Sequence, residues 1–199
     1  MATDTAAERP ASALSLDTRK IVIAGILGGI AIFLGYTRLG FIPVPNLSGN
    51  ATIMHVPAIL GGAVEGPLVG LLAGGIFGIF SWVQAEIPLF KDPFVAIVPR
   101  LLIGVVAWAV FEALRRANVY LAAAASGVLG SATNTVGVLG LGVLLGYLPA
   151  AAVVPIIPQA VVEAIIAAIV TVVVVKGVLL YRSGRTTAPE IRAGEERRY

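Results

Sequence analysis

Residues 93–114, with the sequence PFVAIVPRLLIGVVAWAVFEAL, form a long apolar run that holds one arginine, Arg100, near its start. A helix of this length, rising about 1.5 Å per residue, covers the roughly 30 Å hydrocarbon core of a bilayer. A charged side chain at that depth is costly unless it faces water, an anion or a partner carboxylate. The run therefore predicts a membrane-spanning helix with a functional arginine inside it.

The whole chain shares this apolar character. Its 199 residues are 58% hydrophobic and 13% charged, and their mean hydropathy is +0.95. A soluble protein of this size has too little interior to hide so much apolar surface, whereas a bilayer solvates it directly. The composition predicts a single intramembrane domain.

Apolar runs bounded by proline, glycine or charge predict six membrane helices, at residues 21–36, 53–64, 68–83, 93–114, 121–145 and 151–180. The second run is too short to cross a bilayer, so we expect a partial span that begins in a cavity or a folded loop. Lipid cannot hydrogen-bond the backbone, and no run alternates as barrel strands do. We therefore expect an all-α six-helix bundle over residues 21–181, without β structure.

The polar segments 1–20 and 182–199 are predicted to be disordered cytoplasmic tails. If the N-terminus is cytoplasmic, six crossings return the C-terminus to the same side, and most basic residues then lie inside. Merging the second run with its neighbour would give five spans and break this pattern. We expect a multi-pass protein of the cell membrane with both termini in the cytoplasm.

Several kinds of chemistry are excluded by the residues present. The chain has no cysteine and one histidine, so no disulfide, thiol or metal site is expected. Its net charge of +3 is too small to indicate nucleic-acid binding. It has no Walker A run and no hydrolase motif, so it is not expected to be an enzyme or to use ATP itself. No cofactor is expected, and energy for any transport must come from a gradient or a partner.

Arg100 is the first candidate ligand contact, because its planar guanidinium suits a carboxylate. An ion pair with Glu163, or extension toward the outer surface, would also explain it. Pro99 removes one helical hydrogen bond and can kink the helix beside Arg100.

Further candidates lie where a cavity would open toward the outside, and each could instead be a packing or interface residue. The loop that follows the first span could form the edge of that cavity, and its polar side chains could bind ligand or cap the next helix. His55 stands alone, so it could pack or contact ligand but not hold a metal. The candidates besides Arg100 are Asn50, Thr52, His55, Trp82, Gln84, Asn134, Gln159 and Glu163.

The first span carries two pairs of small residues at a spacing of four. Ala24 lies four residues before Gly28, and Gly25 four before Gly29. Small residues at this spacing allow another helix to approach closely. The face could pack inside this chain or dock a partner subunit.

Four motifs together are similar to those of a known transporter family. They are residues 52–57 (TIMHVP), Gly66-Pro67 with residues 75–78 (GIFG), residues 92–100 (DPFVAIVPR) and residues 133–135 (TNT). Over residues 20–181 the chain resembles the S components, the substrate-binding subunits, of energy-coupling factor (ECF) vitamin transporters. Within that family it is most similar to the pantothenate-type branch.

The resemblance implies a six-helix S-component fold with an outward-facing pocket that the first outer loop caps. It also implies docking to a transmembrane T component with two ATPases, whose ATP hydrolysis topples the S component and releases substrate inside. The family's Ala-xxx-Ala docking motif corresponds to Ala24 and Gly28. Arg100 matches the family's Pro-Arg position, which would make it the contact for the carboxylate of pantothenate or a similar vitamin.

Other functions stay open from the sequence. A stand-alone carrier could use protons through Glu163, although no internal duplication typical of such carriers is visible. An S component for folate, hydroxymethylpyrimidine or cobalamin would keep the same fold. A scaffold without ligand would leave the buried Arg100 unexplained.

Overall fold

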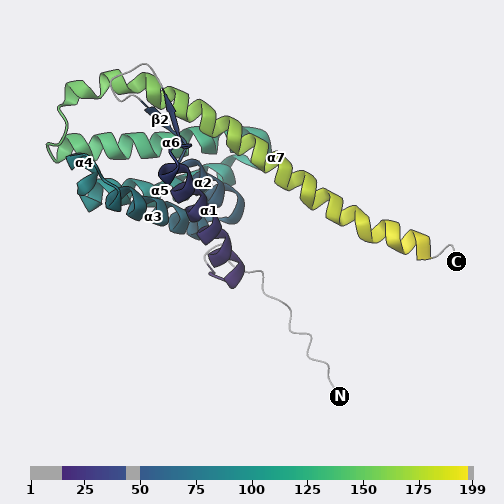
Figure 1. Cartoon of the computed structure of the whole chain (residues 1–199). Helices are drawn as coiled ribbons and strands as arrows, with labels where there is room; N and C mark the ends of the chain where they lie inside the picture. Colours follow the sequence, from purple (N-terminus) through teal and green to yellow (C-terminus); the bar gives the residue numbers. More distant parts are fainter. Residues whose placement is uncertain (1–14, 44–49, 197–199) are drawn as a thin grey trace.

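The structure is a computed structural model that describes residues 15–43 and 50–196, with side chains for residues 15–43 and 51–184. It is mostly helical (Figure 1). The α-helices are α1 (Thr18–Tyr36), α2 (Val56–Leu60), α3 (Pro67–Val83), α4 (Pro88–Lys91), α5 (Pro93–Leu114), α6 (Val119–Leu144) and α7 (Ile157–Glu196). A π-helical turn, η1 (Gly61–Glu65), follows α2, and two 3-10 turns, η2 (Ala150–Ala152) and η3 (Val154–Ile156), precede α7.

In the described part of the chain, four helical segments are long and apolar enough to cross a membrane. They are α1, α5, α6 and the segment Ala150–Gly184, which contains most of α7. The segment Val56–Glu65 and α3 are shorter apolar helices. The prediction of a multi-pass helical membrane protein is confirmed, and the second predicted helix is indeed short.

Local sequence explains where the helices begin. Asp92 precedes α5, and its side chain accepts a 2.8 Å hydrogen bond from the backbone N–H of Phe94. Asn118 caps α6 in the same way. Both side chains satisfy N–H groups that have no partner within the helix. Gly66 has a φ of 109°, a conformation that glycine adopts without strain, and it directs the chain from η1 into α3.

Two short antiparallel strands follow α1, so the prediction of no β structure was wrong. β1 (Phe41–Pro43) pairs with β2 (Asn50–Thr52), and Phe41 lies opposite Thr52. The rule that excludes open sheet edges applies only within the hydrocarbon of the bilayer. This hairpin follows the end of α1, where other groups can satisfy its edges. Residues 44–49, part of the expected outer loop, lie outside the described residues.

The chain ends differ from the predicted boundaries. The predicted N-terminal tail covers residues 1–20. Residues 1–14 lie outside the described residues, and helix α1 already begins at Thr18. Asp17 sets this start, because its side chain accepts a hydrogen bond from the N–H of Lys20 at 2.7 Å. At the other end, α7 continues past residue 181 to Glu196. The disorder of residues 182–199 stays a prediction.

Glycines allow the closest helix crossing in the core. A Cβ added at Gly70 of α3 would collide with the backbone of Gly104 in α5, and one at Gly62 of η1 would collide with the carbonyl of Gly104. Small residues let helix backbones approach in this way where lipid provides no hydrophobic drive for association. Ile59 and Ile103 are fully buried in the same core. The crossing fixes α5 against α3 and η1.

Charged residues mark two ends of the bundle. Arg19 at the start of α1 and Arg182 of α7 both pair with Glu65, with nitrogen–oxygen distances of 2.9 and 3.7 Å. These three residues define what we call the arginine end. Arg38, after α1, pairs with Glu86 at 3.7 Å near the opposite ends of α1 and α3. The start of α1 and this part of α7 therefore lie at the same end, and α7 extends beyond the other helices (Figure 1).

Candidate ligand-binding site

Arg100 lies inside the protein. It is 4% exposed, and its Nη1 atom donates a 2.7 Å hydrogen bond to the carbonyl oxygen of Val95. The guanidinium carbon lies 4.9 Å from the ring centre of Phe90 and 5.6 Å from that of Phe77. Aromatic faces attract a cation at these distances, and more strongly when water is excluded. The prediction of a buried arginine in this span is confirmed.

Pro99 explains how the arginine is held. In a regular helix the N–H of residue 99 would donate to the carbonyl of Val95, but proline has no N–H. The Val95 carbonyl is therefore free, and the guanidinium of Arg100 takes the place of the missing donor. The proline and the arginine act as a pair: one removes a helical hydrogen bond and the other replaces it.

Glu163 is also buried, with 3% of its surface exposed, but it binds groups other than Arg100. Its Oε1 atom accepts hydrogen bonds from the backbone N–H of Thr52 at 2.8 Å and from Nε2 of Gln159 at 2.9 Å. Among the described residues, no ion pair joins Arg100 to Glu163. Glu163 and Gln159 of α7 thus hold strand β2, and the arginine keeps no carboxylate partner within this part of the chain.

Four buried polar side chains keep atoms without a hydrogen-bond partner in the described structure. The atoms are both ring nitrogens of His55, Nε of Arg100, Oγ of Ser131 and Oδ1 of Asn134. A buried polar atom without a partner costs about 1–3 kcal/mol, so these atoms are expected to bind a ligand or water. We call these four residues the buried polar cluster.

Helix packing places Asn134 on the face of α6 that meets α2 and α5. On α6, Gly130 faces Ile59 of α2, and Gly137 faces Pro99 of α5. Asn134 lies between these glycines at helical spacing, so it shares their face. His55 immediately precedes α2 and is fully buried. His55, Arg100 and Asn134 therefore lie on or next to three elements, α2, α5 and α6, that pack against one another, and Ser131 lies on α6.

The remaining candidates lie outside the cluster. Trp82 is 43% exposed and donates from Nε1 to the carbonyl of Lys91 at 3.1 Å, which ties the end of α3 to the end of α4. Gln84 ends α3 and is exposed. The Thr52 hydroxyl accepts a hydrogen bond from the N–H of Met54 at 3.2 Å. Asn50 belongs to β2, but its side chain lies outside the described part. Their ligand roles stay predictions.

The small residues of α1 divide between two faces. Ala24 and Gly28 are buried, and a Cβ at Gly28 would lie 2.6 Å from Cδ1 of Ile76 in α3. This pair packs inside the chain. A Cβ at Gly25 or Gly29 would meet nothing within 4 Å. The open small-residue face of α1 is therefore the one that carries Gly25.

Sequence reasoning missed three residues of this region, Phe77, Phe90 and Ser131. Phe77 lies between Gly74 and Gly78, and this glycine spacing was a signal in the sequence that could have indicated it. In the structure α5 passes so close to Gly74 that a Cβ there would collide with the carbonyl of Arg100. Two glycines four apart let α5 approach α3, and an aromatic residue between them can then reach the arginine. Phe90 lies on the separate short helix α4, and no periodic pattern points from it to Arg100.

A guanidinium buried among unpaired polar atoms in a helical membrane bundle is typical of the class of membrane proteins that take a polar solute into their interior. Residues 19–175 match the family described as ECF transporter, substrate-specific component. The chain belongs to that family, as the resemblance of its motifs predicted. The family description names a substrate-specific component of a transporter.

Two individual comparisons agree with this assignment. The solved structure of the S component of a bacterial ECF transporter matches with a TM-score of 0.60 and 17% identity, over 82% of this chain and 96% of that one. That likeness shows the fold. The pantothenic acid transporter PanT of Lactococcus lactis subsp. cremoris (strain MG1363) is 32% identical over 108 residues, 44% of this chain. The match spans 54% of that relative's length, about half of it.

Proposed function

We propose that this ECF S component captures pantothenate or a closely similar small carboxylate vitamin. The observation that carries the proposal is Arg100, a buried cation without a carboxylate partner in the described structure. The similarity to a pantothenic acid transporter supports the choice of vitamin. The chain acts by binding and release, with no bond chemistry and no cofactor of its own.

The buried polar cluster suits the chemistry of pantothenate, which carries a carboxylate, hydroxyls and an amide. Arg100 already uses one nitrogen on Val95, which orients the fork, and its other donors are available to a carboxylate. Phe77 and Phe90 restrict the guanidinium to one position. His55 and Asn134 offer the donors and acceptors that hydroxyl and amide groups need.

The energy is proposed to come from partner subunits, a transmembrane T component and two ATPases that use ATP. The open face of α1 that carries Gly25 and Gly29 supports docking of a partner helix, since nothing in the described structure covers it. The buried pair of Ala24 and Gly28 supports this docking only indirectly, by holding α1 against α3. Nucleic acid has no part in this function.

Calorimetry with pantothenate on the purified chain in nanodiscs tests the substrate. We expect binding that Arg100→Ala weakens by about 2 kcal/mol or more, roughly 30-fold, because a charge-assisted contact is lost. Arg100→Lys should recover part of the affinity, since it keeps the charge but not the planar fork. Arg38→Ala, which removes an exposed arginine, is the matched control and should bind as the parent does.

Two results would overturn this assignment. Unchanged affinity in Arg100→Ala would remove the arginine from the site. Tight binding of folate, hydroxymethylpyrimidine or cobalamin, with none of pantothenate, would give the chain a different vitamin and leave its family unchanged.

A further inference from the structure

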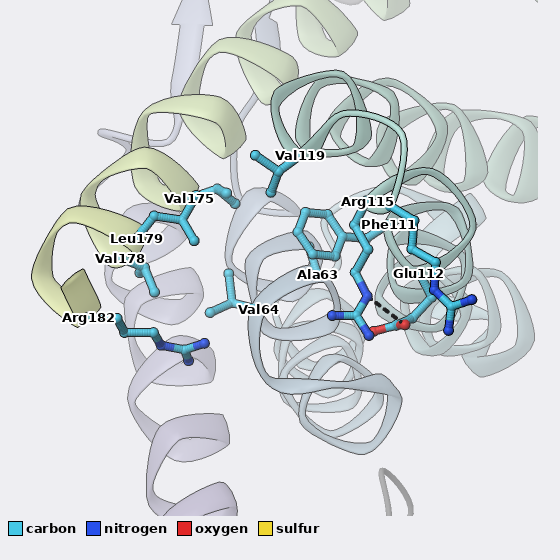
Figure 2. A pocket seen from close by; sticks show the side chains of 11 residues that line it. Ala63, Val64, Phe111, Glu112, Arg115, Val119, Val175, Val178, Leu179 and Arg182 are labelled. Carbon is cyan, nitrogen blue, oxygen red and sulfur yellow. Dashed lines mark hydrogen bonds and ion pairs between the residues drawn. The ribbon is translucent and has the colours of Figure 1, made fainter. Parts of the chain in front are cut away.

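A groove at the arginine end is separate from the buried polar cluster. It has a volume of about 360 Å³ and lies between α7 and the ends of η1, α5 and α6 (Figure 2). Phe111 lies 11 residues beyond Arg100, or about 16 Å along α5. Its apolar lining is Ala63, Val64, Phe111, Val119, Val175, Val178 and Leu179, and its charged lining is Glu112, Arg115, Arg116 and Arg182.

The charged lining has an excess of positive charge. Arg115 pairs with Glu112 at 2.8 Å, and Arg182 pairs with Glu65 at 3.7 Å. Arg116 is exposed and forms no ion pair with any described residue. A second hollow of about 510 Å³ shares Val178 and Arg182 with the groove. It adds one arginine, Arg19, and one glutamate, Glu65, so the lining still carries more positive than negative side chains. The groove mouth therefore attracts an anion.

The apolar and basic residues are arranged in two layers. On α7, Val175 and Val178 precede Arg182 by one to two turns, and on α5 Phe111 precedes Arg115 by one turn. Apolar side chains thus lie toward the middle of the bundle, and arginines lie at its end. Figure 2 shows the valines of α7 extending toward the wall that Val64 and Phe111 form. A phospholipid has the same order, with acyl chains below a phosphate.

The geometry points to a binding site for an anionic phospholipid. Its phosphate would lie among Arg115, Arg116 and Arg182, and one acyl chain would follow the apolar wall between α5 and α7. Basic pockets between membrane helices bind acidic headgroups in this way. A small free anion would satisfy the arginines and leave the wall bare. The bound lipid would join α7 to α5, and this inference does not depend on the identity of the transported vitamin.

Native mass spectrometry of the purified chain tests the site, with phosphatidylglycerol and phosphatidylcholine offered in equal amounts. We expect retained phosphatidylglycerol in excess of phosphatidylcholine. Arg116→Gln should lower that retention about fivefold, the effect of one basic side chain beside an anionic lipid. Lys176→Gln is the matched control, because Lys176 is an exposed cation of the same helix, α7, and does not line the groove. It should retain the lipid as the parent does.

A second measurement compares lipid with its headgroup alone. Phosphatidylglycerol should raise the unfolding temperature of the parent chain in detergent, whereas glycerol phosphate at the same concentration should not. Equal retention of both lipids, equal losses in the two variants, or equal stabilisation by glycerol phosphate would overturn the proposal. If Arg116→Gln keeps the lipid but no longer co-purifies with the energising subunits, the groove belongs to a protein partner instead.

Discussion

At the residue scale, the site depends on a cooperation between Pro99 and Arg100. The proline leaves the Val95 carbonyl without a helical donor, and that carbonyl accepts a hydrogen bond from the guanidinium of Arg100. Helix breakers beside buried charges are usually explained by the bend that they introduce. Here the missing N–H also provides an anchor, which keeps a long flexible side chain in one position before a ligand arrives.

Pro99→Ala should therefore weaken carboxylate binding without weakening the fold. The new N–H of residue 99 would compete with Arg100 for Val95, and the guanidinium would lose its anchor. We expect a loss of about 1 kcal/mol in pantothenate affinity by calorimetry, roughly fivefold, with an equal or higher unfolding temperature.

Pro93→Ala is the matched control for this substitution. Pro93 is the first residue of α5, where a missing N–H leaves no helical carbonyl unpaired. It should bind as the parent does. Parent-like binding by Pro99→Ala would show that the anchor contributes nothing to affinity.

At the element scale, the crossing of η1, α3 and α5 determines where Arg100 lies. Three glycines, Gly62, Gly70 and Gly104, bring the backbones together, and a further glycine pair on α3 brings Phe77 to the guanidinium. Tight crossings of this kind tolerate little added volume, because the neighbours of each missing Cβ are backbone atoms that cannot rotate away.

Gly104→Ala should destabilise the bundle by about 1–3 kcal/mol, since its methyl group would collide with the backbone of Gly70. The measurement is the unfolding temperature of the purified protein in one detergent. Gly140→Ala is the matched control in α6, where nothing lies within 4 Å of the added methyl group. That change should be neutral or slightly stabilising, because alanine favours helix over glycine. Equal behaviour of the two variants would mean that the crossing is looser than described.

At the scale of the whole molecule, most elements could be predicted because each is specified by local residues. The bounds of α5 agree with the predicted run because Asp92 and Pro93 start the helix and the run becomes basic at Arg115. The hairpin of β1 and β2 could not be predicted, because the sequence there does not alternate between apolar and polar residues as strands usually do. The same limit applied to the site: only tertiary contacts decide that Glu163 binds Thr52 and not Arg100.

The proposed topology has six membrane segments with both termini in the cytoplasm. The shared pairing of Arg19 and Arg182 with Glu65 supports an even number of crossings. The chain has no cysteine, so single substitutions can report sidedness. In intact cells a membrane-impermeant maleimide should label Glu86→Cys, and it should label Ala117→Cys at the arginine end only after the membrane is opened. The reverse pattern would invert the orientation.

Helix α7 is anchored at two distant points. Glu163 binds strand β2 near the start of the helix, and Arg182, further along it, pairs with Glu65 at the arginine end. These anchors are 19 residues apart, about 28 Å along a single rod. A rod of that length moves as one piece, so a tilt that parts Arg182 from Glu65 also pulls on the hairpin beside Thr52. The two faces of the membrane are in this sense mechanically connected through one helix.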